Sequence, residues 1–156
     1  MLQRAFDHGV PAAWVTGDSV YGDNRSLRLW LEEHRHAHVL AVSGKEYVWR
    51  AGRHQQVKTL LAALAAEGWC RLRAGDGAKG PRWYDWTWLP LAAPLQPHWR
   101  RWLLVRRSLS APTELTAYVV LAPQVTVLAT VVQVAGSRWP VERCFDAATG
   151  EGGLEQ

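Results

Sequence analysis

The sequence predicts an α/β fold, and three segments near its beginning carry that prediction. Val10–Val15 is a short apolar run bounded by Gly9 and Gly17, which is typical of a buried strand. Arg25–His36 has apolar side chains at helical spacing with charges between them, and Val39–Val42 is a second short apolar run. Strand, helix and strand in this order favour a right-handed crossover that sets the two strands side by side and parallel.

The middle of the chain changes to a pattern rich in strands. Tyr47–Trp49 is strand-like, and Val57–Leu64 then places its apolar side chains on one helical face. Trp69–Arg73 alternates, with Trp69, Arg71 and Arg73 on one side, and Arg82–Leu89 carries aromatic residues on both sides. A turn-rich connection joins these last two runs, so we expect a β-hairpin.

The last third begins after a Pro-rich break at Pro90–Pro97. Trp99–Arg107 and Leu115–Leu121 have the composition of strands, and we expect them to pair antiparallel. Val125–Val134 remains open, because its valines favour a strand while its apolar spacing fits a helix. Arg138–Ala148 looks helical, with Pro140 near the start of the helix.

Composition limits the class of protein. The chain has 156 residues, of which 48% are hydrophobic, so one domain with a real core is expected. Its formal net charge of +4 leans mildly toward polyanionic partners. It contains ten tryptophans, and seven of them fall between Trp49 and Trp102, which marks this segment as distinct.

Targeting signals and cysteines give little further information. No apolar run approaches the length of a membrane helix, and Met1–Phe6 lacks the layout of an export signal, so we expect a cytoplasmic protein and no membrane partner. Cys70 and Cys144 are far apart and without metal-ligand spacing. We expect both to be small core residues in a reducing compartment.

Asp18 is the first candidate for chemistry. It closes the first apolar run, and a carboxylate at the carboxyl end of a buried strand sits where open α/β sheets place their sites. The alternative is that Asp18 or Asp23 only caps the helix that begins near Asn24. The spacing alone leaves both interpretations open. A nearby triplet, His34-x-His36-x-His38, straddles a helix end, so we expect a solvated turn there in preference to a metal site.

Two basic segments are candidates for binding phosphate. Gly75–Pro81 has glycines at phosphate-loop separation, but Pro81 stands where the lysine of such a loop must be. A basic loop tip with Lys79 and Arg82 remains. The second segment interleaves arginines with Trp99 and Trp102, which suits a nucleic-acid surface; its arginines are Arg100, Arg101, Arg106 and Arg107. The alternative is an edge strand whose arginines prevent aggregation.

Four segments together resemble bacterial insertion-sequence transposases of the DDE superfamily. They are Val-Thr-Gly-Asp18-Ser-Val-Tyr-Gly, Gly-Asp-Gly-Ala-Lys-Gly-Pro-Arg82 with Tyr84-Asp-Trp86, Trp-Arg-Arg-Trp-Leu-Leu-Val-Arg-Arg107, and Gly-Ser-Arg138-Trp-x-Val-Glu142-x-Cys-Phe. The resemblance covers nearly all of the chain. It implies a partial ribonuclease-H-like α/β fold over residues 1–156, with residues 45–98 as a β-rich insertion inside a transposase catalytic domain.

The resemblance also implies a function and a site. The family performs DNA transposition by metal-dependent strand cleavage and transfer, with Mg²⁺ or Mn²⁺ held by clustered carboxylates. Asp18 then corresponds to the second metal-binding acid and Glu142 to the third, and Arg138 contacts phosphate at the transposon end. The implied partners are double-stranded DNA of the transposon ends and, in the full-length family, a second copy of the protein. The implied location is the bacterial nucleoid.

Departures from the family pattern affect the expected activity. Ala135 and Thr149 stand at the positions of a signature tyrosine and lysine, and the sequence holds no counterpart of the first acid. We therefore expect an incomplete, inactive catalytic-domain remnant that is marginally stable by itself. The alternatives are a noncatalytic DNA-binding remnant that uses the basic, Trp-rich insertion, and an aromatic-rich β module that binds sugars.

Overall fold

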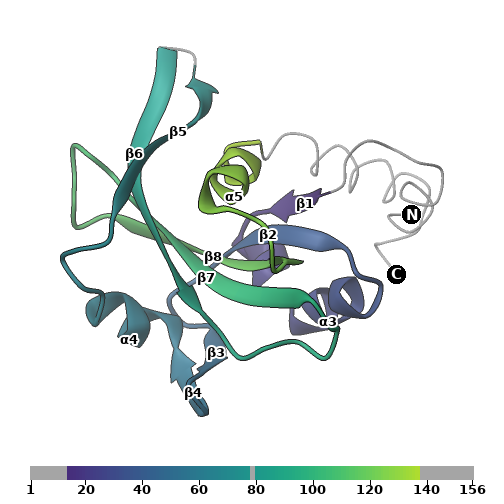
Figure 1. Ribbon diagram of the computed structural model, residues 1–156. Helices are drawn as coiled ribbons and strands as arrows, with labels where there is room; N and C mark the ends of the chain where they lie inside the picture. Colours follow the sequence, from purple (N-terminus) through teal and green to yellow (C-terminus); the bar gives the residue numbers. More distant parts are fainter. Residues whose placement is uncertain (1–13, 78–79, 138–156) are drawn as a thin grey trace.

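The computed structural model describes residues 14–77 and 80–137, and it shows a mixed α/β fold dominated by one curled sheet (Figure 1). Six strands form this sheet in the spatial order β1-β2-β8-β7-β6-β5. Their bounds are β1 (Trp14–Gly17), β2 (Ala37–Val42), β5 (Cys70–Gly77), β6 (Gly80–Pro90), β7 (Trp99–Arg107) and β8 (Leu115–Pro123). Arg138, Glu142, Lys79 and Cys144 lie outside the described residues.

The predicted strand–helix–strand unit is confirmed. β1 and β2 pair in parallel, with Trp14 opposite Ala37 and Gly17 opposite Leu40. Between them lie the single turn α2 (Ser19–Gly22) and the helix α3 (Arg25–Glu33). The strand that precedes Asp18 therefore has β2 as its neighbour, as expected. It continues to Gly17, two residues beyond the predicted apolar run, and the structure describes it from Trp14 onward.

The remaining strands of the main sheet pair antiparallel. The hairpin of β5 and β6 is confirmed, and so is the pairing of β7 with β8. β2 joins the two halves by pairing antiparallel with β8, so that His38 lies opposite Leu121. The hairpin projects beyond the rest of the sheet (Figure 1). The segment 45–98 is thus divided: its second half extends the main sheet, while β3 (Tyr47–Arg50) and β4 (Arg53–Gln56) form a small sheet of their own.

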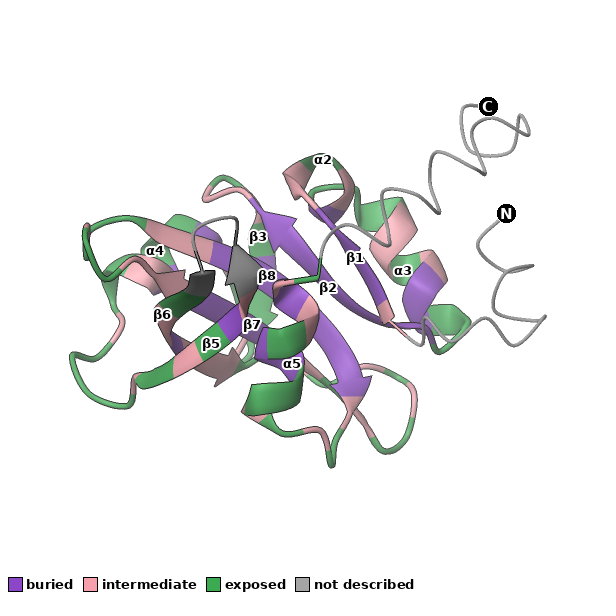
Figure 2. Cartoon of the chain, turned by 90° about the horizontal axis from the view of Figure 1, so that it is seen from above, coloured by how far each residue is buried: buried purple, intermediate pink, exposed green. Residues whose placement is uncertain are grey.

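Two hydrophobic clusters cover the two faces of the sheet. On one face α3 and α4 (Val57–Ala62) pack with β3, around Leu31, Leu40 and Leu103. On the other face α5 (Leu128–Ala135) packs over Trp86, Trp102 and Tyr118. Burial is concentrated in β2, β7 and β8 at the centre of the sheet (Figure 2). The segment whose sequence left strand and helix open is therefore a helix, because Val131, Val132 and Ala135 share one buried face.

Three expectations need correction. Cys70 is exposed, because β5 is an edge strand and Cys70 stands at its first position. The helix predicted to reach His36 ends at Glu33, and Arg35 takes a positive φ of 55° just after it. His36 and His38 are buried and do not lie in a solvated turn, since β2 begins at Ala37 and enters the core at once. None of the helices in the described ranges is both long and apolar enough to cross a bilayer.

Candidate functional site

Asp18 directly follows β1, at the carboxyl end of the parallel β1–β2 pair. Its side chain is partly buried, and its Oδ1 accepts a hydrogen bond from the backbone N–H of Val20 at 3.1 Å. Its backbone carbonyl accepts from the N–H groups of Tyr21 and Gly22. Asp18 therefore caps the turn α2, while Asn24 caps α3 through the N–H of Leu27. A cap of this kind uses one carboxylate oxygen, so it does not exclude a metal ligand.

The turn that carries Asp18 is fixed against β2. A Cβ atom on Gly22 would lie 1.7 Å from the carbonyl oxygen of Ala41, so only glycine permits this close approach. Asp23 Oδ1 accepts a hydrogen bond at 3.0 Å from the N–H of Ser43, one residue past β2. The carboxylates of Asp18 and Asp23 thus belong to the same edge of the sheet. The described residues contain no group of three or more His, Cys, Asp or Glu side chains arranged to hold a metal ion.

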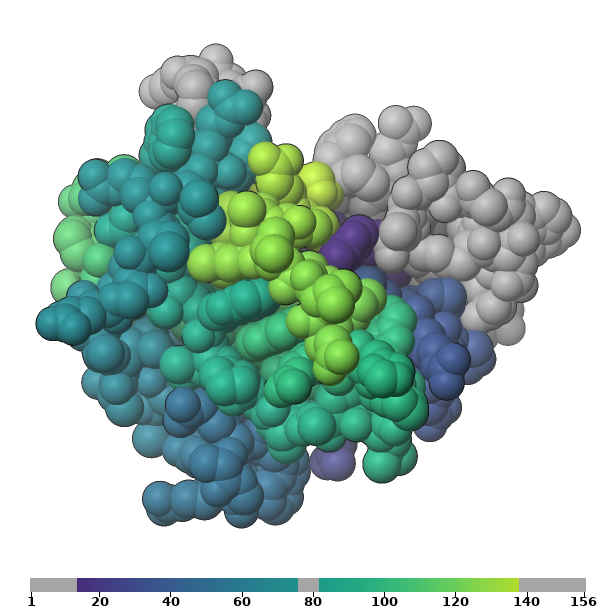
Figure 3. All heavy atoms as spheres, in the orientation of Figure 1, coloured from purple at the N-terminus to yellow at the C-terminus, as the bar shows by residue number. Residues whose placement is uncertain are grey.

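The end of α5 approaches the Asp18 strand. The hydroxyl of Thr16, two residues before Asp18, lies 3.4 Å from the carbonyl oxygen of Ser137, which accepts its hydrogen bond. On the opposite side Arg82 donates to the carbonyl of Gly136 at 3.1 Å, and a Cβ atom on Gly136 would lie 1.9 Å from the carbonyl oxygen of Ala74. Figure 3 shows α5 between the teal hairpin and the purple β1. The chain therefore leaves its last described residue beside the strand that ends at Asp18.

The predicted DNA-binding arginines do not form one surface. Side chains alternate along β7, so Arg100 and Arg106 face the α5 side of the sheet, while Arg101 and Arg107 face the α3 side. Arg106 lies 4.5 Å above the ring of Tyr84 and donates to Thr116, whereas Arg100 is exposed.

The other two β7 arginines bind carboxylates. Arg101 forms a two-pronged ion pair with Glu32, at 2.5 and 2.7 Å. Arg107 pairs with Asp85 at 3.1 Å and lies 4.1 Å above the ring of Trp69. Arg82 donates to the backbone carbonyls of Ala74 and Gly136, at 3.4 and 3.1 Å. DNA binding by the predicted arginines stays a prediction, and three of the four on β7 also have intramolecular partners.

The histidine triplet divides between surface and core. His34 stacks on Trp30 with 4.2 Å between ring centroids, and His36 lies 5.5 Å from the same ring. His38 is 2% exposed, and this burial lowers the pKa of its imidazole from 6.5 to about 4. Its Nδ1 lies 3.2 Å from the carbonyl oxygen of His36. His38 is therefore neutral at pH 7.

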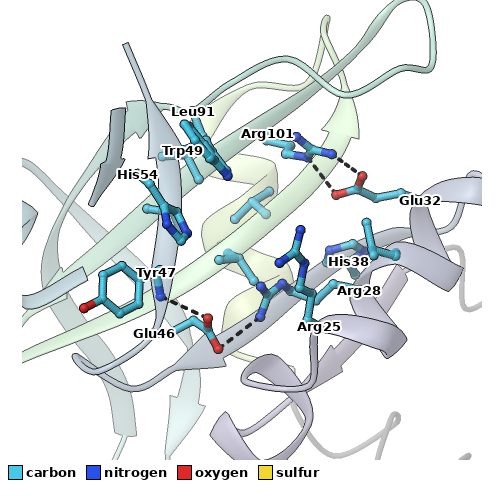
Figure 4. A pocket seen from close by; sticks show the side chains of 14 residues that line it. Arg25, Arg28, Glu32, His38, Glu46, Tyr47, Trp49, His54, Leu91 and Arg101 are labelled. Atoms are coloured by element: carbon cyan, nitrogen blue, oxygen red, sulfur yellow. Dashed lines mark hydrogen bonds and ion pairs between the residues drawn. The ribbon is translucent and has the colours of Figure 1, made fainter. Parts of the chain in front are cut away.

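A cavity of about 260 Å³ lies between α3 and the small β3–β4 sheet (Figure 4). Its polar walls include two ion pairs, Arg101 with Glu32 and Arg28 with Glu46 at 3.6 Å. Tyr47, Trp49 and His54 supply an aromatic edge; their rings are in contact, and Trp49 and His54 stack at 4.8 Å. Asp18 does not line this cavity, so it is separate from the edge of the sheet that carries the acid.

Comparison with known proteins adds no family. No protein-family model matches the chain, and no curated protein sequence matches it. Geometry and the resemblance in its motifs are therefore the basis for any functional assignment.

The site prediction from sequence left out three side chains of the β5–β6 hairpin. Arg71 and Arg73 are exposed on β5, and Trp83 on β6 is 50% exposed. The alternation of Trp69, Arg71 and Arg73 was the available signal, because it predicts that these side chains share one face of a strand. The exposure of Trp83 could not be predicted, since its strand also carries the fully buried Trp86.

Proposed function

We propose that this chain is part of a DDE transposase catalytic domain with a ribonuclease-H-like fold, in which Asp18 supplies one carboxylate to a divalent-metal site. The parallel β1–β2 pair supports the proposal, because open α/β sheets hold their ligands outside the carboxyl ends of parallel strands. The position of β1 supports it too. Within the described residues β1 has β2 as its one partner, which leaves its other edge for the strand that carries the first acid in this family.

The contact between Thr16 and Ser137 carries the proposal. It places the end of α5 beside the strand of Asp18, although 121 positions separate the two residues. Consecutive Cα atoms are about 3.8 Å apart, so the Cα of Glu142, five residues further on, is limited to about 19 Å from that of Ser137. Covalent connection therefore permits the proposed third acid to approach the proposed second acid.

The proposed chemistry of the complete catalytic domain, to which this chain would contribute two of the three acids, is in-line displacement at phosphorus in double-stranded DNA. A divalent ion such as Mg²⁺ or Mn²⁺, when bound, stabilises the attacking and leaving oxygens. Asp18 has a carboxylate oxygen that its cap leaves unused, and Glu142 would supply the second carboxylate. Arg138, four residues before Glu142 in the sequence, would hold a phosphate. A homodimer at the two transposon ends completes the proposal.

Iron-directed cleavage of the protein tests the metal site directly. Fe²⁺ replaces Mg²⁺, and ascorbate with peroxide generates hydroxyl radicals that cut the backbone close to the bound ion. We expect cuts near residues 18 and 142, mapped by mass spectrometry, and we expect excess Mg²⁺ to suppress both. Asp18→Asn and Glu142→Gln should each reduce both cuts, because the two carboxylates share the ion.

The control is Asp23→Asn, which retains an oxygen to accept the hydrogen bond from Ser43 and should leave the cuts unchanged. Cuts elsewhere, or cuts near residue 18 that persist in Asp18→Asn, would contradict the proposal. The alternative, a noncatalytic DNA-binding remnant, predicts that the chain binds DNA but is not cut near either acid.

A further inference from the structure

The cavity between α3 and the small β3–β4 sheet is separate from the proposed metal site. Its volume is about 260 Å³, and its apolar lining includes Val48, Leu91 and Val119. A cavity of about 150 Å³ holds one benzene ring. The space is therefore large enough for one ring, or two fused rings, together with a small charged substituent.

Three aromatic side chains form one side of this cavity (Figure 4). Tyr47 and Trp49 project on the same face of β3, and His54 lies opposite Trp49 on β4. The ring of His54 lies 4.9 Å from that of Tyr47 and 4.8 Å from that of Trp49, so the three rings are held together before any ligand enters. Stacking across the strands stabilises the small sheet, but it leaves Tyr47 and Trp49 47% and 51% exposed.

The charged side chains that line the cavity include more guanidinium groups than carboxylates. Arg101 pairs with Glu32 and Arg28 with Glu46, so each of the two carboxylates already has a guanidinium partner. Arg25 is the third arginine of the lining, and it is exposed at the start of α3. Within the described residues no hydrogen bond or ion pair involves its guanidinium. One positive charge therefore borders the cavity without a carboxylate to match it.

We propose that this cavity binds a small planar aromatic acid, with its ring packed against Trp49 and His54 and its anionic group held by Arg25. Aromatic rings gain from stacked or edge-to-face contact, and a guanidinium binds a carboxylate or phosphate through two charge-assisted hydrogen bonds. The rings are already in place, so little side-chain freedom is lost when the ligand binds. Binding here requires neither Asp18 nor a metal ion, and it does not depend on the proposed function.

Titration of the ¹⁵N-labelled protein with 2-naphthoate, followed by NMR, tests the proposal. The indole N–H signal of Trp49, assigned by its absence from Trp49→Ala, should shift and saturate with a dissociation constant of about 1 mM or lower, as expected for so small a ligand. The uncharged 2-naphthamide, which has the same shape, should bind about 3- to 10-fold more weakly. Comparison with 2-naphthyl phosphate shows whether the site favours a carboxylate or a phosphate.

Two variants separate the anion contact from the ring contact. Arg25→Gln should weaken 2-naphthoate about 3- to 10-fold and leave 2-naphthamide unchanged, whereas Arg53→Gln, an exposed arginine outside the cavity lining, controls for net charge. Trp49→Ala, followed through backbone amide signals, should weaken both probes about 5-fold or more. Its matched control is Trp83→Ala on β6, because Trp83 is 50% exposed and lies outside the lining. Circular dichroism verifies that each variant is folded.

Three outcomes would overturn the proposal: no shift of the Trp49 signal at about 10 mM 2-naphthoate, equal affinities for 2-naphthoate and 2-naphthamide, or equal losses for Trp49→Ala and Trp83→Ala. Asp18→Asn should bind the probe as the unchanged chain does. Failure of the metal-site experiment therefore leaves this result intact, and a failure here leaves the metal site intact.

Discussion

The ion pair between Arg101 and Glu32 joins β7 to α3, and replacing Arg101 by methionine should destabilise the fold. The guanidinium donates to both oxygens of Glu32, at 2.5 and 2.7 Å, and also to the carbonyl of Ala92 at 3.3 Å. Glu32 is 8% exposed as a residue. Methionine retains most of the apolar stem of Arg101, so the variant removes mainly the charge and the hydrogen bonds.

The size of the effect follows from the carboxylate that is left behind. Removing one partner of a fully buried pair costs about 3–5 kcal/mol, because the other charge remains buried and unpaired. Here the side chains of Arg101 and Glu32 are 29% and 11% exposed, so water reaches part of the pair. We therefore expect a loss of about 2–3 kcal/mol in the free energy of unfolding, or roughly 5–10 °C in the melting temperature of a chain of this size.

A double-mutant cycle measures this quantity. Urea unfolding is compared for Arg101→Met, Glu32→Gln and the double variant. The loss in the double variant should be smaller than the sum of the two single losses by about 1 kcal/mol or more, because no unpaired charge remains in it. Arg100→Met, which changes an exposed arginine on the same strand, should shift the free energy of unfolding by less than about 0.5 kcal/mol. Equal losses for Arg100→Met and Arg101→Met, or no coupling in the cycle, would refute the reasoning.

Two further predictions concern buried side chains. The pKa of His38 is about 4 in the folded protein and 6.5 in the unfolded chain, so between these pH values only the unfolded chain binds a proton at this imidazole. The free energy of unfolding should therefore be constant above pH 6.5 and decrease by roughly 3 kcal/mol as the pH falls to 4. Urea unfolding across this range checks it: His38→Gln should flatten the profile relative to exposed His54→Gln, and an unaltered slope would contradict the assignment. Trp86 is fully buried and its indole donates to the carbonyl of Leu72 at 3.3 Å, so Trp86→Ala should cost about 3–5 kcal/mol, whereas Trp83→Ala should cost less than about 1 kcal/mol. Comparable losses in calorimetry for the two variants would show that burial does not separate these tryptophans.

Most elements of the fold could be predicted from local patterns. Short apolar runs bounded by glycine gave the parallel strands, and turn residues between alternating runs gave the hairpin. The helix at Leu128–Ala135 could not be decided, because valine favours strands wherever no packing overrides it. Tertiary contact decided it, since Val131 and Val132 pack against the sheet only when they share a helical face.

The candidate site was less accessible to sequence reasoning. A strand-end position for Asp18 followed from an apolar run that stops at a carboxylate. The sequence did not show which arginines form intramolecular ion pairs, because Glu32 is distant in sequence from Arg101, and Asp85 is distant from Arg107. Cys70 shows the same limit: alternation indicates which side of a strand a residue faces, while exposure depends on whether that strand lies at the edge of the sheet.

The pairing of β2 with β8 has a consequence for how the protein is made. β2 emerges early from the ribosome, whereas the strand that covers its second edge is among the last described segments to be synthesised. Until β8 is synthesised, the edge of β2 that faces β8 has no strand to pair with, and closing so long a loop is slow. Nascent chains should therefore stay dependent on chaperones until β8 has left the exit tunnel, and stalling just before Leu115 should leave them sensitive to protease.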